Sequence, residues 1–141
     1  MNIAIRSAAL TALVFLAAAC SSEPPPAATA VTTANARPGC IAAPSDAVLT
    51  ITTALTGDAK KVGETFGIEE GKRRYIGGNI YDGAGKSLST GDVWIIEENK
   101  LYALSAGARS NTKAPDGREL PDKPASGVGN ARFVSECARP S

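Results

Sequence analysis

The sequence contains three cysteines, Cys20, Cys40 and Cys137, and their arrangement indicates two kinds of cysteine chemistry. In an oxidising compartment thiols pair, and an odd thiol is a liability. A bond between Cys40 and Cys137 would leave Cys20 spare, directly after the apolar run "FLAAA". The count therefore predicts a disulfide between Cys40 and Cys137 and a different role for Cys20. A redox-active pair is the alternative, but it lacks the close spacing that tunes thiolate reactivity.

General acid–base chemistry would depend on carboxylates, because the sequence has no histidine. This composition excludes histidine-dependent serine hydrolases and histidine-containing zinc sites. Paired carboxylates can cleave glycosides, but most of those present lie in segments typical of turns. We therefore expect no catalytic residue, no cofactor and no metal site. The carboxylates considered are Asp46, Asp58, Glu64, Glu69, Glu70, Asp82, Asp92, Glu97 and Glu98.

Three further patterns favour a structural explanation. The run "DGAGKS" (82–87) is similar to the tail of a phosphate-binding loop, but Ile80 replaces the first glycine, and "SLSTGD" predicts a turn where a helix is needed. The basic triplet at 72–74 could touch anionic headgroups, but it directly follows Glu69 and Glu70 and is typical of a salt-balanced surface. Aromatic residues at strand spacing are usually core rather than a ligand groove. They are Tyr75, Tyr81, Trp94 and Tyr102.

Residues 1–19 have the pattern of a secretory signal peptide. Arg6 precedes an uncharged run of about 13 residues, shorter than the roughly 20 that a membrane-spanning helix needs. Ala17 to Ala19 supply the small side chains that signal peptidases require. The segment "LAAAC" resembles the lipobox of bacterial lipoproteins, which implies diacylglycerol modification of Cys20 after cleavage. Leu16 lies one position earlier than in the usual pattern, so ordinary secretion after Ala19 is the alternative.

The remaining chain divides into a tether and one domain. Residues 20–39 are rich in Pro, Ala and Thr and cannot bury enough apolar surface to fold, so we expect a disordered, lipid-anchored tether. Fully extended, it would reach about 60 Å from the bilayer. Residues 40–141 suit a single globular domain. Arg6 is the one charge in 1–19, which leaves 14 of the 15 basic residues against 14 acidic ones, and this balance argues against nucleic-acid binding.

The domain alternates turn residues with one helical and several strand-like segments. Ser45 or Asp46 can cap a helix that ends near Gly57, although its β-branched residues favour a strand. Strands are predicted at 60–68, 73–81, 93–96 and 101–104, the third of them apolar on both faces, as in a strand covered on both sides. The expected fold is α+β, with an N-terminal helix packed on a small, mainly antiparallel four-stranded sheet and closed by one disulfide.

Alternation within the first two strands predicts which side chains share a face. Val62, Phe66 and Ile68 should lie on one face of the first strand. In the second strand, Ile76 and Ile80 should lie on one face and Tyr75 and Tyr81 on the other.

The last third of the chain lacks clear periodicity. Residues 111–130 hold three prolines and three glycines, so a binding loop or a mobile excursion is expected, and the balanced charges favour the excursion. Phe133, Val134 and Cys137 are expected to return to the core on a short helix or an edge strand.

Residues 73–110 resemble small lipoproteins of actinobacteria that have no established activity, and the likeness supports location and fold only. We therefore expect an exported protein, anchored by acylated Cys20 to the outer face of the cell membrane, or to the outer membrane in a Gram-negative source. Its expected function is that of a non-catalytic binding module with an envelope protein or glycan as partner. The alternatives are a carboxylate-dependent hydrolase, which needs a cleft with two carboxylates about 5–10 Å apart, and a purely structural lipoprotein.

Overall fold

The computed structural model describes residues 38–140, so the predicted signal peptide, Cys20 and most of the tether lie outside the described residues. Within this range, no helix has both the length and the hydropathy needed to cross a membrane. The elements in chain order are α1 (Ser45–Ala54), β1 (Lys61–Glu70), β2 (Arg73–Tyr81), β3 (Ser87–Glu97), β4 (Lys100–Ala103), α2 (Ala106–Asn111), the 3-10 helix η1 (Gly117–Glu119) and α3 (Gly129–Ala138).

The four strands form one antiparallel sheet in the order β1-β2-β3-β4, which confirms the predicted four-stranded antiparallel sheet. Two-residue turns join β1 to β2 and β3 to β4. The β3–β4 turn places Glu98 at φ 49° and Asn99 at φ 64°, the left-handed backbone that such tight hairpins require. Ile76 pairs with Gly67 of β1 and with Trp94 of β3, so these residues align across the middle of the sheet.

The connection between β2 and β3 is shorter than predicted. The carboxylate of Asp82 accepts hydrogen bonds from the main-chain N–H groups of Ala84 (2.9 Å) and Lys86 (2.8 Å), which closes the turn locally. β3 therefore begins at Ser87, and the expectation that "SLSTGD" forms a turn is wrong. The absence of a helix after Lys86 agrees with a hairpin connection rather than a phosphate-binding loop.

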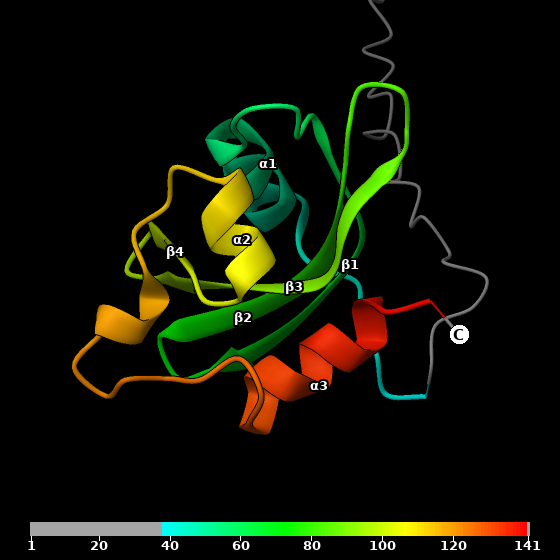
Figure 1. The fold of residues 1–141 in the computed structure, drawn as a ribbon. Helices are drawn as coiled ribbons and strands as arrows, with labels where there is room; N and C mark the ends of the chain where they lie inside the picture. Colours follow the sequence, from blue (N-terminus) through cyan, green and yellow to red (C-terminus); the bar gives the residue numbers. More distant parts are fainter. Residues whose placement is uncertain (1–37, 141) are drawn as a thin grey trace, which may run out of the picture. The chain divides into compact units, whose positions relative to one another are not determined.

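The sheet is covered on both faces (Figure 1). On one face Trp94 and Ile76 pack with Ile51 of α1, and Ala108 of α2 belongs to the same cluster. On the other face, a second cluster contains Val134 of α3. Residues 93–96 alternate between the two clusters and are all buried, which confirms the prediction that this strand is apolar on both sides because both sides are covered.

A bulge in β1 changes which of its side chains share a face. The register shifts between Gly63 and Phe66, and Glu64 adopts φ 44°. The extra residue breaks the two-residue period of the strand. Val62 therefore packs in the α1 cluster, whereas Phe66 packs with Cys137 and Ala138 of α3. The prediction that Val62, Phe66 and Ile68 lie on one face is wrong, because alternation holds only within an unbroken ladder.

The C-terminal segment forms helix α3 rather than an edge strand. Gly77 permits its close approach to the sheet, since a Cβ at that position would lie 2.1 Å from the carbonyl oxygen of Val134. The predicted disulfide is confirmed: Cys40 and Cys137 are bonded, with a Cα–Cα distance of 5.7 Å and a sequence separation of 97. The bond joins the start of the described chain to α3.

Candidate functional site

The segment that follows Cys40 lies along the outer edge of β1. Gly67 N donates to Ile41 O at 2.9 Å, and Ala43 N donates to Thr65 O at 3.0 Å. Ala42 forms a bridge with Phe66 between these two bonds. The disulfide at Cys40 fixes the start of this segment, so Ile41 is held next to β1 immediately after the predicted tether.

A groove lies beside this added segment, at the end of the sheet nearest the β1–β2 turn. Gly67 forms part of its floor, and neighbouring residues already lie close over it. A Cβ there would lie 3.1 Å from Ile76 Cδ1 and 3.5 Å from Pro44 Cδ. Ile41 stands on the open side with 69% of its surface exposed. The groove has a volume of about 310 Å³ and is lined by Ile41, Ala42, Pro44, Gly67, Ile68, Glu69, Arg74 and Ile76.

An ion pair closes one part of the groove rim. Arg74 of β2 donates to Asp46 in the first turn of α1 at 2.7 Å. The hydrogen bond from Arg74 is the main reason that the pKa of Asp46 lies below its usual range. The charges of this pair therefore offset each other, and the pair links α1 to the end of the sheet.

Glu69 is the second charged residue of the groove, and it is exposed. Its carboxylate makes no hydrogen bond or ion pair with another residue of the described chain. The groove therefore combines an aliphatic floor with one uncompensated negative charge.

The basic triplet at 72–74 does not form a free cationic patch. Arg73 donates to Asp122 at 2.6 Å and to Glu97 at 3.1 Å, and its hydrogen bond to Asp122 is the first cause of its raised pKa. Arg74 is engaged by Asp46, and Lys72 alone projects into solvent from the turn. This agrees with the predicted salt-balanced surface.

A second cavity brings two carboxylates together. Glu70 and Asp122 both line a cavity of about 280 Å³ below the loop that precedes α3. Asn130 donates to Glu70 at 3.1 Å, and the pKa of Asp122 is lowered mainly by its hydrogen bond with Arg73. A general acid in glycoside cleavage needs a raised pKa. The pKa of Asp122 is lowered, so Asp122 does not meet this requirement.

Asp92 is the buried member of the carboxylates considered above, with 2% of its surface exposed. Ser105 donates to its Oδ1 at 2.7 Å, and Gly107 of α2 closes over it. A Cβ on Gly107 would lie 2.2 Å from that same oxygen. Asp92 is therefore enclosed between β3 and α2 and does not line the groove beside Ile41.

A buried polar cluster holds the C-terminal end of α3 on the sheet. Asn79 donates to Ala138 O at 2.7 Å and accepts from Gly91 N at 2.8 Å. Its amide nitrogen also donates to Glu64 at 3.1 Å, and the hydroxyl of Tyr81 donates to the same carboxylate. Burial is the main cause of the raised pKa of Tyr81, and Glu64 adds to it. Glu64, the bulge residue with a positive φ, therefore acts as a hydrogen-bond acceptor within this structural cluster.

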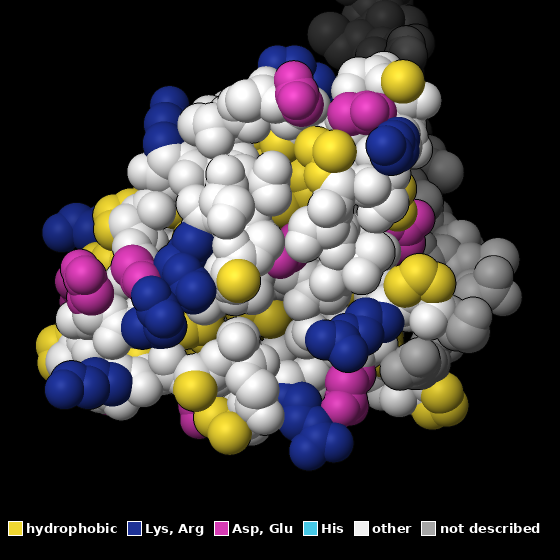
Figure 2. Space-filling view, in the orientation of Figure 1, with side chains coloured by type: hydrophobic (Ala, Val, Ile, Leu, Met, Phe, Trp, Pro, Cys, Tyr) yellow, Lys and Arg dark blue, Asp and Glu magenta, His cyan; other side chains and the backbone are white. Residues whose placement is uncertain are grey.

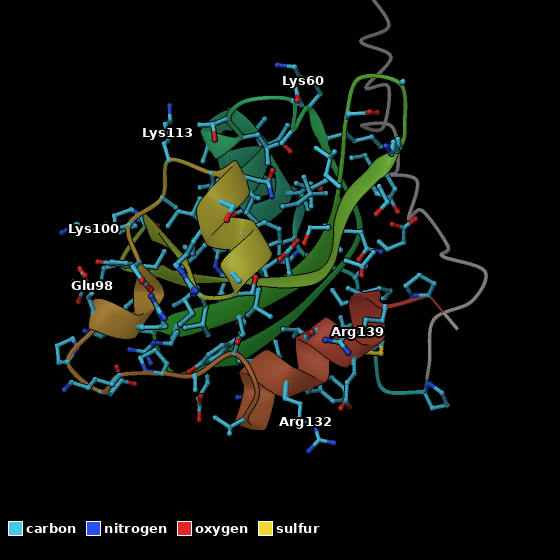
Figure 3. The ribbon with its side chains drawn as sticks, in the orientation of Figure 1. Lys60, Glu98, Lys100, Lys113, Arg132 and Arg139 are labelled. Carbon is cyan, nitrogen blue, oxygen red and sulfur yellow. A yellow bond between two sulfur atoms is a disulfide. The ribbon has the colours of Figure 1, made fainter. Side chains whose placement is uncertain are left out.

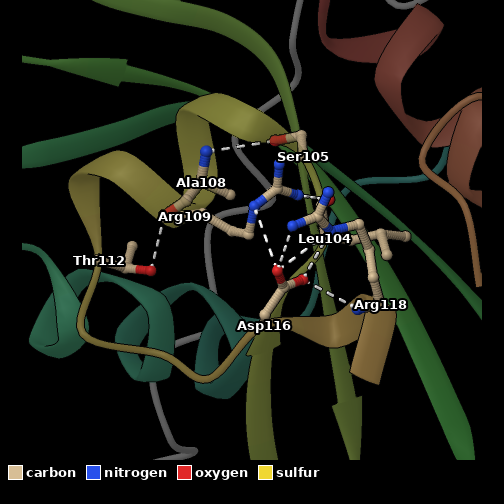
Figure 4. Close-up of polar contacts among 7 residues, drawn as sticks. All are labelled: Leu104, Ser105, Ala108, Arg109, Thr112, Asp116 and Arg118. Atoms are coloured by element: carbon tan, nitrogen blue, oxygen red, sulfur yellow. Dashed lines mark hydrogen bonds and ion pairs between the residues drawn. The ribbon is translucent and has the colours of Figure 1, made fainter. Parts of the chain in front are cut away.

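Residues 111–130 are tied to the domain by Asp116 (Figure 4). Its carboxylate accepts from Arg118 at 2.5 Å and lies 3.6 Å from Arg109 Nε. The hydrogen bond from Arg118 is the main reason that the pKa of Asp116 falls to about 2. Ala103 N also donates to Pro115 O at 2.8 Å. This part of the predicted excursion is therefore anchored against β4.

The face of the molecule that is visible in the space-filling view (Figure 2) carries no patch of a single charge sign. Lys and Arg side chains are interspersed with Asp and Glu there (Figure 2). Lys60 and Lys113 project outward from connecting segments, and Lys100 projects outward from the start of β4 (Figure 3). Within residues 38–140, no group of three or more His, Cys, Asp or Glu residues is placed to hold a metal ion.

The groove was not among the sites expected from the sequence. Of its residues, Glu69 and Arg74 were considered as charged candidates, and Ile68 and Ile76 only as strand residues. The groove itself depends on Gly67 facing Ile41 across a strand pairing that no sequence pattern indicates. Comparisons with protein families, with curated proteins and with solved structures found no match. The function is therefore inferred from the residues and their arrangement.

Proposed function

We propose that the protein is a lipid-anchored, extracytoplasmic interaction module that binds an envelope partner in the groove beside Ile41. The anchor is supported by the cysteine pairing, because Cys40 and Cys137 are bonded to each other and the remaining cysteine, Cys20, follows a signal-like apolar run. Covalent acyl chains give stable membrane attachment when more than one is present.

The observation that carries the binding function is the exposure of Ile41 beside an aliphatic groove. Burial of apolar surface contributes roughly 25 cal/mol per Å², so an isoleucine that stays 69% exposed forgoes most of this gain. Its main chain is fixed by β1 and its neighbour Cys40 by the disulfide, so the side chain is held in place at the surface. A partner that covers Ile41 and fills the groove beside it would recover this free energy.

The anchor is tested with Cys20→Ser in the cells that produce the protein. The wild-type chain is expected in the membrane fraction, with an acyl mass on its first mature residue, and the variant in the soluble fraction. Cys40→Ser is a useful contrast, since it breaks the disulfide without removing the proposed attachment point. An unmodified Cys20 in the mature wild-type protein would contradict the anchor.

The binding function is tested by placing a photo-reactive amino acid at position 41 and irradiating the intact envelope. We expect a discrete cross-linked product that the same probe at position 113 does not give, because Lys113 is an exposed residue outside the groove. A probe at position 41 that gives no product above the position-113 control would overturn the proposed binding site.

A further inference from the structure

The end of β1 presents three recognition features within one short stretch: an aliphatic groove, main-chain groups that face outward, and the carboxylate of Glu69. From this combination, and on the basis of the function proposed above, we infer that the groove binds an extended peptide segment in which a branched aliphatic side chain lies two residues from a lysine or arginine.

The groove favours an aliphatic side chain. The groove passes over Gly67 and is lined by the side chains of Ile41, Ile76 and Pro44. Its volume of about 310 Å³ is at the lower end of the roughly 300–1,000 Å³ of small-molecule sites. A side chain supplied by a peptide suits this size, and apolar walls give no hydrogen-bond partner for a polar one.

The outward main-chain groups favour an extended backbone. Gly67 N donates to Ile41 O across the edge of β1, and groups two residues further along a strand face the same way. The N–H and C=O of Glu69 therefore face this edge, and no other described residue hydrogen-bonds to them there. The chain before Ile41 turns aside, because Gly39 adopts φ 87° and Cys40 is bonded to α3. A partner strand can hydrogen-bond to such an edge.

The charges favour a basic residue in the peptide. Arg74 is neutralised by Asp46 at 2.7 Å, whereas Glu69 has no partner among the described residues. A lysine or arginine two positions from the inserted aliphatic residue would lie near Glu69, since residues two apart in an extended peptide share one face, as Gly67 and Glu69 do in β1. An acidic residue there would meet an uncompensated like charge.

The test uses the mature chain, residues 20–141, carrying Cys20→Ser and uniformly labelled with ¹⁵N. Three synthetic heptapeptides with serine at every even position are titrated: at the odd positions, which share one face, one alternates lysine and valine, one alternates glutamate and valine, and one alternates lysine and serine. We expect the lysine–valine peptide to shift the amide signals of Ile41, Gly67 and Glu69. The glutamate–valine peptide should bind about tenfold more weakly, and the lysine–serine peptide should leave these signals unchanged.

Two matched variants separate the groove from general electrostatics. Glu69→Gln should weaken binding of the lysine–valine peptide by about fivefold. Glu98→Gln should leave it unchanged, because Glu98 is an equally acidic, outward-pointing residue at the β3–β4 turn (Figure 3), separated from β1 by two strands. The disulfide and the dispersion of the spectrum report whether each variant is folded.

Three results would overturn the inference: no shift at the groove amides with the lysine–valine peptide, equal binding of the glutamate–valine peptide, or equal binding of the lysine–serine peptide. If any of these occurs while the probe at position 41 still cross-links in the envelope, the peptide chemistry is wrong and the proposed function stands. If the cross-link is absent as well, the proposed function is also overturned.

Discussion

Individual residues in this domain act mostly by satisfying charges and buried polar groups. Asp116 fixes the loop before η1 through Arg118 and Arg109, and Asn79 connects the end of α3 to β3. At this scale the sequence indicated residue types but not their partners. The charge balance of residues 111–130 was visible in the sequence, whereas the contact between Asp116 and Arg109 depends on the path of the chain past β4.

The lowered pKa of Asp116 predicts a loss of stability in acid. Its pKa is about 2 in the folded protein against an ordinary value of 3.8, so its contribution is complete above about pH 4 and is lost as the pH falls through 2. Asp116→Asn should therefore lower the melting temperature at pH 6 more than at pH 2, measured by circular dichroism. Because Asp46 and Asp122 also have lowered pKa values, the difference between wild type and variant isolates Asp116. A difference that does not depend on pH would contradict this role.

Gly77 is the residue whose substitution should most disturb the packing of α3. The added methyl of Gly77→Ala would lie 2.1 Å from the main-chain oxygen of Val134, and neither backbone can move without displacing a core element. We expect a loss of about 1–3 kcal/mol in the free energy of unfolding, measured by urea titration. Gly83→Ala is the control, since its nearest contact would be an ordinary 3.7 Å, and it should change stability by less than about 0.5 kcal/mol.

The elements follow the hydrophobic pattern of the sequence where the ladder is regular and depart from it at the bulge. The central strand and the β3–β4 hairpin were predicted, because residues 93–96 are all apolar and a polar turn follows. The side chains that share each face of β1 were not predicted correctly, since the bulge at Glu64 appears only once β1 is paired with β2. The β2–β3 connection was similarly misjudged, because Asp82 closes it from within.

The bulge predicts an unusual tolerance to deletion. Removing Glu64 would leave Thr65 alone opposite Gly78, so Val62 and Phe66 would keep their present faces. The variant should fold with the disulfide formed, at a modest cost from the lost contacts with Asn79 and Tyr81. Deleting Ile95 from the regular part of β3 should instead abolish folding, because half of that strand would exchange faces. Proton spectra of the two variants distinguish these outcomes, and an unfolded Glu64 deletion would show that the bulge is not dispensable.

Across the whole molecule, one covalent bond joins the first described segment to the last helix. Cys40 and Cys137 lie 97 residues apart in sequence, and a bond that closes so long a loop restricts the unfolded chain strongly. The same bond holds Ile41 against β1 and so keeps the groove formed. The sequence predicted this pairing from the cysteine count, but it gave no sign that the bond also shapes a surface.

Replacing both bonded cysteines by serine should lower the free energy of unfolding by about 2–5 kcal/mol, measured by urea denaturation of the otherwise intact mature chain. Hydrogen exchange at Gly67 should also accelerate more than exchange at Trp94, since the bond from Gly67 N to Ile41 O depends on a segment that the disulfide fixes. Equal acceleration at both amides would mean that the disulfide stabilises the domain without holding the groove.

The central claim is that this groove is where the protein meets its partner. The most direct measurement is photo-cross-linking from position 41 in the intact envelope, compared between the otherwise wild-type chain and Gly67→Val. The position does not demand a left-handed backbone, but a Cβ there lies 3.1 Å from Ile76 Cδ1 and 3.4 Å from Ala43 Cα, so the valine obstructs this part of the groove and the dispersion of the proton spectrum must show that the variant is folded. We predict a discrete product that the Gly67→Val chain loses while remaining folded and anchored. A product of equal yield in both chains would contradict the claim.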